Sequence, residues 1–475
     1  MPSEKTEPRP VTIRNCNPPV LWRYNAGQQR VSRGSTTQPS IPRVQMLRPS
    51  SASLALTANP EVAMRIRSLG LLAELSVPAA FVGLIAVCLT ACGSSGSAPT
   101  SGGPPPPPGS AVTQPTTLNL YPNQSSSQAA LLTVMVTAVG TAPVSMPLGF
   151  DTGSAGVTLY AESIFPSSMV SSSGFVFAAG QTSITYDGIT ITNLQGTRSY
   201  GTLNQTVEYG NLGFAQLTFG DAQGQLTTEV MPVFLFYSLE DLTGNPYSPP
   251  GWQGWFGVAS TNGTIDVAGA VEPPDGFAAC STQTTTSCYV VSVMKYMDYG
   301  DQVNAGFALS PAAIQTCDIT TAGNCNPAPM LTVGLNANVE SGFSTTPLVC
   351  PPNGYVGPPE IAGYPVCQKN IPNVTIAASG ASVGSFTGDA FFDTGTPYIY
   401  LSTPTGDSFP AVVVPGSTVT VTPPSGFNYS YTAADAGTAN TVVDAGGDGN
   451  SIIGVQYFTT NSFLLDFTSG IEGWK

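Results

Sequence analysis

The chain has 475 residues, of which only 9% are charged, and its formal net charge is −14. It contains no histidine, which excludes Ser-His-Asp and Cys-His catalysis, histidine-ligated zinc and histidine general bases. Acid-base chemistry would therefore fall to carboxylates. From Gly93 onward, four basic residues stand against 24 acidic ones, a net charge of −20, which excludes a nucleic-acid partner.

The first 92 residues differ in character from the rest. Residues 1–63 hold 8 of the 14 basic residues, and we interpret them as a mis-annotated extension upstream of the true start at Met64. A basic stretch, eleven apolar residues at 79–89 and the sequence Leu-Thr-Ala-Cys-Gly follow, so residues 64–91 read as a lipoprotein signal peptide. Its end resembles a bacterial lipobox, in which Cys92 is lipidated. The alternative is a transmembrane helix, for which eleven residues are short.

Residues 92–116 are dominated by Gly, Ser and Pro and include five consecutive prolines at 104–108. Gly/Ser segments are flexible and proline runs are extended. We predict a tether that holds an exported, lipid-anchored body in the cell envelope, on the periplasmic or outer-membrane side. The alternative is a disordered terminus without a lipid on Cys92.

Six cysteines remain in the folded body and form three close pairs along the chain. An even number fits disulfides formed in an oxidising compartment. Sequential pairing closes three short loops and is the preferred connectivity: Cys280–Cys288, Cys317–Cys325 and Cys350–Cys367. A zinc site is the alternative, although the chain has neither a Cys-x-x-Cys pair nor a histidine.

From residue 118 onward, short runs rich in Val, Thr, Tyr, Phe and Ile are separated by Gly, Pro, Asn and Asp. This pattern is typical of strands joined by turns. The best helical candidates are residues 291–299 and 310–315. The sequence therefore predicts a mostly β body with enough apolar residues for a large core.

Two copies of one short motif lie far apart in this body: Phe-Asp-Thr-Gly-Ser at 150–154 and Phe-Asp-Thr-Gly-Thr at 392–396. Each follows an apolar run, so each motif is predicted on a loop just beyond a strand. One Asp-Thr-Gly is weak evidence in a chain rich in Thr and Gly. Two copies with matching flanks predict two carboxylates that similar half-structures deliver to one shared site.

Together with further segments in the same order, the motifs resemble the pepsin-like aspartic endopeptidase family over residues 117–475. Residues 199–202 are similar to the family's flap hairpin, and residues 254–258 and 452–458 to the apolar segments that thread behind the two catalytic loops. The resemblance implies a mostly β, bilobal fold with two related β-barrel-like lobes and a central cleft. We expect the lobes at residues 117–304 and 305–475.

The resemblance also implies roles for individual residues. Asp151 and Asp393 would form the catalytic dyad, and Tyr200 and Gly201 would belong to a flap that closes over substrate. Six residues would support the catalytic loops: Thr152, Gly153, Ser154, Thr394, Gly395 and Thr396. One departure is Thr158, which stands where the family usually has a Trp that supports the flap Tyr.

We expect an aspartic endopeptidase that hydrolyses peptide bonds with water activated between two carboxylates, without metal or cofactor. Its partners would be a peptide or unfolded protein substrate and, through the lipid, a membrane; we expect a monomer. An acidic cluster at Asp435, Asp444 and Asp448 suggests calcium as an alternative use, but its ligand spacing is irregular. The alternative function is a non-catalytic pepsin-fold surface lipoprotein that binds peptide, glycan or a partner protein.

Overall fold

The computed structural model describes parts of one compact unit, Ser95–Lys475. The described residues are 109–124, 130–201, 206–241, 244–246, 251–267, 287–319, 324–351 and 360–475. The predicted upstream extension, signal peptide and lipidated Cys92 lie outside them. The last residues of the predicted tether lie inside: β1 (Ala111–Val112) pairs with β17 (Asp298–Tyr299), so the folded body begins before residue 117.

Strands dominate the described residues, as the sequence predicts. Helical structure in this part of the chain comprises one short helix, α1 (Ala337–Glu340), and three 3-10 turns. The helical candidate at 291–299 contains one of these turns, η2 (Val293–Tyr296), which Ser292 caps by accepting from the Met294 amide. The candidate at 310–315 was wrong, because this segment has no helix and ends in a short strand.

The first motif follows a hairpin of β3 (Leu131–Val139) and β4 (Ala142–Asp151). Asp151 is the last residue of β4, and β5 (Ala155–Tyr160) leaves the loop on the other side. A later strand, β14 (Trp255–Val258), runs parallel to β4 and antiparallel to β5. This arrangement fixes the loop from behind, as the resemblance of residues 254–258 implies.

The second motif has the same surroundings. Asp393 directly follows β25 (Gly384–Phe392), and β26 (Ile399–Thr403) leaves the loop. The later strand β30 (Asn450–Ile453) runs parallel to β25 and antiparallel to β26. The two motif loops are therefore built by equivalent sets of three strands, which explains why their sequences match.

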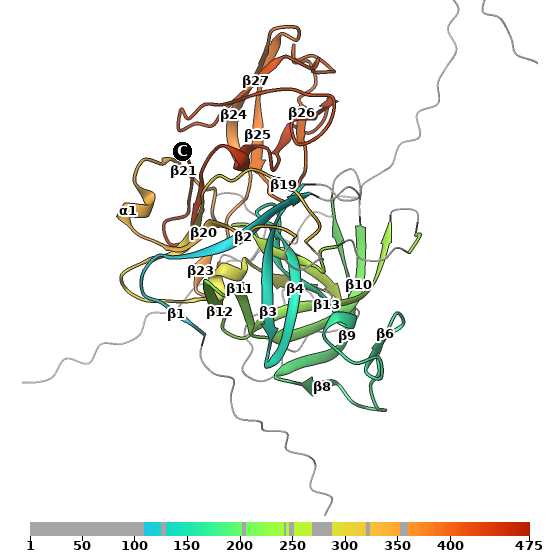
Figure 1. Ribbon diagram of the computed structural model, residues 1–475. Helices are drawn as coiled ribbons and strands as arrows, with labels where there is room; N and C mark the ends of the chain where they lie inside the picture. Colours follow the sequence, from blue (N-terminus) through green and yellow to red (C-terminus); the bar gives the residue numbers. More distant parts are fainter. Residues whose placement is uncertain are drawn as a thin grey trace, which may run out of the picture. The chain divides into compact units, whose positions relative to one another are not determined.

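The strands around the second motif belong to a seven-stranded sheet in the order β28-β27-β24-β25-β30-β26-β29. Its other members are β24 (Ile371–Ser379), β27 (Thr418–Thr422), β28 (Tyr429–Thr432) and β29 (Thr441–Ala445). Figure 1 shows these strands in orange and red, grouped apart from the green strands that follow the first motif. The predicted mostly β fold with two related lobes is confirmed.

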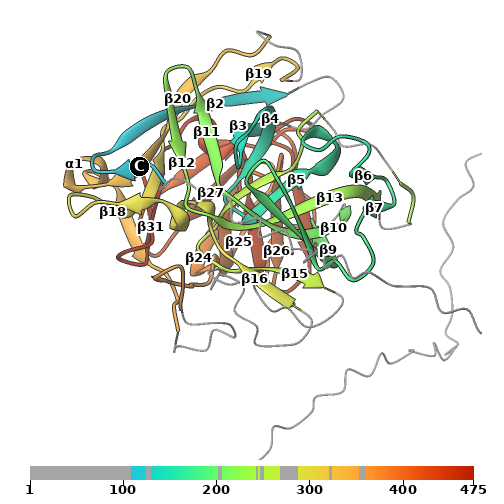
Figure 2. The same ribbon diagram turned by 90° about the horizontal axis from the view of Figure 1, so that it is seen from below.

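A further sheet connects the two lobes. β2 (Thr116–Gln124) pairs with β3 and with β20 (Ala328–Leu335), and β2 and β20 lie side by side in both views (Figure 1, Figure 2). The sheet continues through three strands: β18 (Asn304–Leu309), β31 (Phe463–Asp466) and β32 (Ile471–Trp474). Beneath the motif loops, the Phe150 ring stacks on Phe256 and meets Phe307 edge-on, so both lobes share one aromatic core.

The longest hairpin is formed by β9 (Ile189–Tyr200) and β10 (Thr206–Ala215), with β13 (Met231–Asp241) on the far side of β10. Tyr200 pairs with Thr206 at its tip, and residues 202–205 lie outside the described chain. The remaining strands and 3-10 turns are β6 (Val170–Ser171), β7 (Gly174–Phe175), β8 (Ser183–Tyr186), β11 (Leu217–Asp221), β12 (Gly224–Thr227), β15 (Gly263–Val267), β16 (Ser287–Val290), β19 (Gln315–Thr316), β21 (Ser344–Pro347), β22 (Glu360–Ile361), β23 (Tyr364–Pro365), η1 (Ala161–Ser163) and η3 (Tyr457–Thr459).

Two of the three predicted disulfides are confirmed, Cys317–Cys325 and Cys350–Cys367. The predicted partner of Cys288, Cys280, lies outside the described residues. The two bonds indicate an oxidising environment of the kind that exported proteins meet. No helix among the described residues is long and apolar enough to cross a membrane.

Candidate active site

The two motif loops meet and are locked together by their threonines. The Thr152 amide donates to Oγ1 of Thr394, and the Thr394 amide donates to Oγ1 of Thr152, both over 3.0 Å. Each hydroxyl then donates to the carbonyl that precedes the opposite aspartate: Thr152 to Phe392 over 2.7 Å and Thr394 to Phe150 over 2.5 Å. These buried bonds hold the backbone around the two aspartates in one fixed arrangement.

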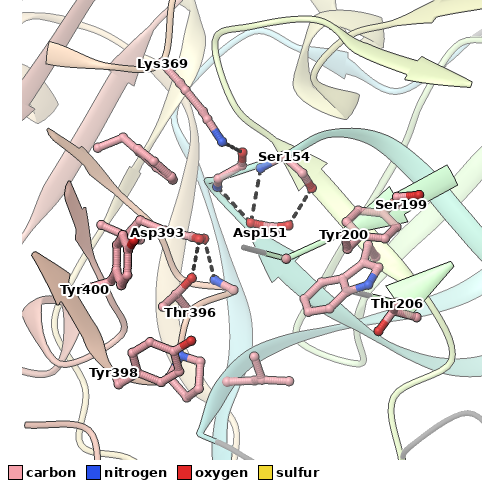
Figure 3. Close-up of a pocket in the computed structure, with 18 of the residues that line it drawn as sticks. Asp151, Ser154, Ser199, Tyr200, Thr206, Lys369, Asp393, Thr396, Tyr398 and Tyr400 are labelled. Atoms are coloured by element: carbon pink, nitrogen blue, oxygen red, sulfur yellow. Dashed lines mark hydrogen bonds between the residues drawn. The ribbon is translucent and has the colours of Figure 1, made fainter. Parts of the chain in front are cut away.

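Each carboxylate is held by its own loop in the same way (Figure 3). The Gly153 amide donates to Oδ1 of Asp151 over 2.8 Å and the Ser154 hydroxyl to Oδ2 over 2.5 Å. For Asp393, Gly395 donates to Oδ1 over 2.8 Å and Thr396 to Oδ2 over 2.6 Å. Four of the six residues predicted to support the loops thus donate directly to the two carboxylates, and the two threonines brace the loops against each other.

The motif glycines leave room for the opposite carboxylate. A Cβ on Gly153 would lie 2.5 Å from Cγ of Asp393, and a Cβ on Gly395 would lie 2.8 Å from Oδ1 of Asp151. Such distances are shorter than van der Waals contact, so any side chain at either position would push the aspartates apart. Close approach of the two carboxyl groups therefore explains why the third residue of each motif is glycine.

Burial and proximity make it costly to ionise both groups. Asp151 is 6% exposed and Asp393 8%. Burial, followed by the negative charge of Asp393, raises the pKa of Asp151 to about 7, although hydrogen bonds from Ser154 and Gly153 oppose the shift. Such a pair holds one proton between its members over the acidic range, and the titration belongs to the pair.

The dyad lies at the base of a cleft with a volume of about 550 Å³. Both lobes contribute to its walls, which are rich in apolar and aromatic side chains. The lining residues around the two motifs are Leu131, Ser199, Tyr200, Gly201, Thr206, Trp252, Trp255, Lys369, Phe391, Pro397, Tyr398, Tyr400 and Ile452. The predicted flap residues Tyr200 and Gly201 are therefore part of the same cleft as the dyad.

Tyr200 is supported by a tryptophan that sequence reasoning left without a role. The Trp255 ring lies 5.6 Å from the Tyr200 ring and 4.4 Å from Trp252, measured between centroids. It is seated over Gly149, where a Cβ would lie 2.7 Å from the indole. The Gly-Trp-Phe-Gly segment can be recognised in the sequence, but the contact of Trp255 with Tyr200 depends on the position of β14 in the sheet.

Thr158, the departure from the family pattern, lies directly behind this support. Its Oγ1 accepts from the Trp255 amide over 3.1 Å and donates to Oε1 of Glu208 over 3.1 Å. A threonine at this position thus fixes the backbone of the tryptophan that packs against Tyr200. The aromatic contact to Tyr200 comes from β14, whereas the family pattern would place a tryptophan in β5.

Two ionisable residues lie buried in the hairpin of β9 and β10. Arg198 and Glu208 face each other across β9 and β10 and are 5% and 0% exposed. The Arg198 guanidinium donates to the Ala155 carbonyl and lies 4.9 Å from the centroid of the Tyr200 ring. Burial raises the pKa of Glu208 to about 8, against the opposing effects of Arg198 and Thr158. The hairpin therefore contains a buried carboxyl group that stays protonated in acid.

The described residues contain no group of three or more His, Cys, Asp or Glu side chains placed to hold a metal ion. The cluster considered for calcium is engaged in other contacts: Asp444 accepts from the Tyr400 hydroxyl over 2.7 Å, and Asp448 from the Ser402 hydroxyl over 3.0 Å.

Many solved structures match this chain. The crystal structure of an aspartic proteinase from Irpex lacteus aligns with 76% of this chain and 97% of its own length, at 16% sequence identity and a TM-score of 0.44. No protein-family model and no curated protein matches the sequence.

Proposed function

We propose that this protein is a pepsin-like aspartic endopeptidase. The observation that carries the proposal is the dyad: two buried carboxyl groups on equivalent, cross-braced loops, each with a hydroxyl and an amide donor. A retired site has no need of matched donors on both carboxylates.

The chemistry follows from one proton shared between Asp151 and Asp393. The ionised member removes a proton from water, and the oxygen of that water bonds to the carbonyl carbon of the peptide. The protonated member donates to the carbonyl oxygen as negative charge develops there. Proton transfer to the amide nitrogen then lets the C–N bond break, which releases an amine and a carboxylic acid. The amide and hydroxyl donors orient both carboxylates for these steps.

The cleft suits an extended peptide. Its walls of aromatic and aliphatic side chains would bury apolar substrate residues. Tyr200 and Gly201 at the end of β9 border the cleft, where an extended backbone can add strand-like hydrogen bonds. We propose that this hairpin closes over substrate and excludes water, with Trp255 as the support of Tyr200.

We further propose that the enzyme is an exported, monomeric lipoprotein of the cell envelope, with residues 1–63 upstream of the true start and residues 64–91 removed as a signal peptide. The disulfides support export, and the lipobox sequence supports a lipid on Cys92. Radiolabelled palmitate should be incorporated into the wild type and not into Cys92→Ser. Labelling of both proteins, or of neither, would refute the anchor.

Cleavage of an unbiased peptide library from acid to neutral pH, with and without pepstatin, tests the activity. Asp151→Asn and Asp393→Asn should each lower the rate by at least about 100-fold. Asp407→Asn, which changes an exposed carboxylate outside the cleft, is the matched control and should leave the rate unchanged.

Intact disulfides and an unchanged unfolding transition would show that the variants are folded. Folded Asp151→Asn and Asp393→Asn proteins that keep full activity would overturn the proposal. A folded wild type that neither cleaves peptides nor binds pepstatin would favour a peptide-binding lipoprotein instead.

A further inference from the structure

The position of one lysine points to the substrates of this cleft. The body from Gly93 onward has only four basic residues, Arg198, Lys295, Lys369 and Lys475. Arg198 and Lys295 are buried, at 5% and 2% exposure, and Lys475 is exposed at the end of the chain. Lys369 lines the cleft beside the dyad. In a chain so poor in cations, the cleft thus receives a positive charge that most of the surface lacks.

The backbone that carries Lys369 is fixed from both lobes. Cys367, two residues earlier, is bonded to Cys350, and its amide donates to the Ser260 carbonyl over 3.2 Å. The amide of the next residue, Gln368, donates to the Val349 carbonyl over 2.8 Å. Strand β24 begins two residues after Lys369. The lysine is therefore presented by a braced segment, which reduces the entropy lost when it binds a ligand.

The ammonium group is held at the first motif and retains binding capacity. Its Nζ donates to the Gly153 carbonyl over 2.5 Å and lies 3.9 Å from the centroid of the Phe391 ring (Figure 3). No carboxylate among the described residues forms an ion pair with it. An ammonium has three N–H donors, so the carbonyl and the ring face leave one for a ligand. The group that would complete this environment is an anion.

We propose that Lys369 is a specificity-determining residue that selects a substrate carboxylate, an Asp or Glu side chain, at the position that lies over Gly153. The inference rests on the proposed function and refines its substrate class. The other walls of the cleft are mainly apolar and aromatic, so an acidic residue among apolar ones is the sequence that fits. Lys369 is partly buried, so water screens the charge-assisted hydrogen bond less than it would on the open surface.

The test compares peptides that are identical except for Glu or Gln at each position in turn. The wild type should cleave the Glu peptide with a kcat/KM about 10- to 100-fold above that of the Gln peptide at one position. Lys369→Met should abolish this ratio. Lys475→Met, which removes the exposed cation at the chain end, is the matched control and should retain it. The ratio should also fall towards one below about pH 4, because the Glu side chain is then protonated.

Two outcomes would overturn the inference. One is a wild type without a Glu preference at any position. The other is a Lys369→Met variant that loses activity on both peptides equally, which would mean that the lysine only positions the Gly153 loop.

Calorimetric binding of the same peptides to Asp393→Asn separates this inference from the activity. If no peptide is cleaved but the Glu peptide binds more tightly in a manner that depends on Lys369, the proposed hydrolysis fails and the selection of a carboxylate stands. If the binding shows no dependence on Lys369, the selection fails whether or not peptides are cleaved.

Discussion

Glu208 offers a direct test of how the hairpin of β9 and β10 is stabilised. Its side chain is fully buried and receives one hydrogen bond, from Thr158, and Arg198 lies opposite without removing the cost of ionisation. Burial raises its pKa from 4.5 to about 8. Glu208→Gln keeps the shape of the side chain and its carbonyl acceptor but cannot ionise. We expect this variant to be less sensitive to rising pH than the wild type.

The expected size of the stability difference follows from the raised pKa of Glu208. The folded-state pKa lies above the unfolded value, so the contribution of Glu208 to stability is fully present below about pH 4.5 and is lost as the pH rises towards 8. Each pH unit across this window costs about 1.4 kcal/mol. Between pH 4.5 and pH 7, the free energy of unfolding should therefore fall by about 3 kcal/mol more in the wild type than in Glu208→Gln.

Equilibrium urea unfolding at pH 4.5 and pH 7, with disulfides intact, measures this difference directly. The other buried carboxyl groups are common to both proteins. The difference between their changes in unfolding free energy from pH 4.5 to pH 7 therefore isolates the contribution of Glu208. Glu360→Gln, in which an exposed carboxylate is replaced, is the control and should follow the wild type. If Glu208→Gln loses as much stability as the wild type over this range, a buried and protonated Glu208 is refuted.

Three further variants probe the dyad and its supports. Thr394→Val removes a hydroxyl that makes two buried hydrogen bonds to the first motif, and should lower the free energy of unfolding by about 2–4 kcal/mol in urea titrations; a loss below about 1 kcal/mol would contradict the cross-brace. Ser154→Ala removes a donor that lowers the pKa of Asp151. The alkaline limb of its pH–kcat/KM profile should therefore move to higher pH, and a shift to lower pH would contradict the role of Ser154. Trp255→Ala should lower kcat/KM about tenfold, through loss of an aromatic pair with Tyr200 and its buried area, whereas Trp255→Phe should retain most activity. Equal losses in both variants would show that ring packing on Tyr200 is not the cause.

The sequence carries the local part of the site. Each carboxylate accepts from residues two and three positions further along the chain, so both sets of donors lie within the repeated five-residue motif. The pairing of the motifs could also be predicted, because equivalent loops imply equivalent strands around them. Runs rich in Val, Thr, Tyr, Phe and Ile between turn residues predict the strands, although some strands, such as β5 and β26, are buried on both faces.

The remaining features depend on contacts between distant parts of the chain. Trp255 supports Tyr200 because β14 runs beside β4, and nothing in residues 254–258 alone specifies that neighbour. Gly149 offers a partial signal, since its missing side chain accommodates the indole, but one glycine among 51 identifies no partner. The failed helix at 310–315 has a simpler cause: six residues are fewer than two turns, too short for a hydrophobic period to specify a helix.

Stability and the proposed activity should respond to pH in the same direction. Glu472 is also buried, and burial raises its pKa well above the usual range, so at least two structural carboxyl groups favour the protonated form in the folded state. Hydrolysis needs one proton on the dyad, and that proton is lost as the pH rises through the raised pKa of Asp151. In acid the body carries little positive charge whose repulsion would destabilise the fold, because it has only four basic residues and no histidine. The carboxyl groups on which the proposed activity depends are thus accompanied by others that make the fold more stable in acid.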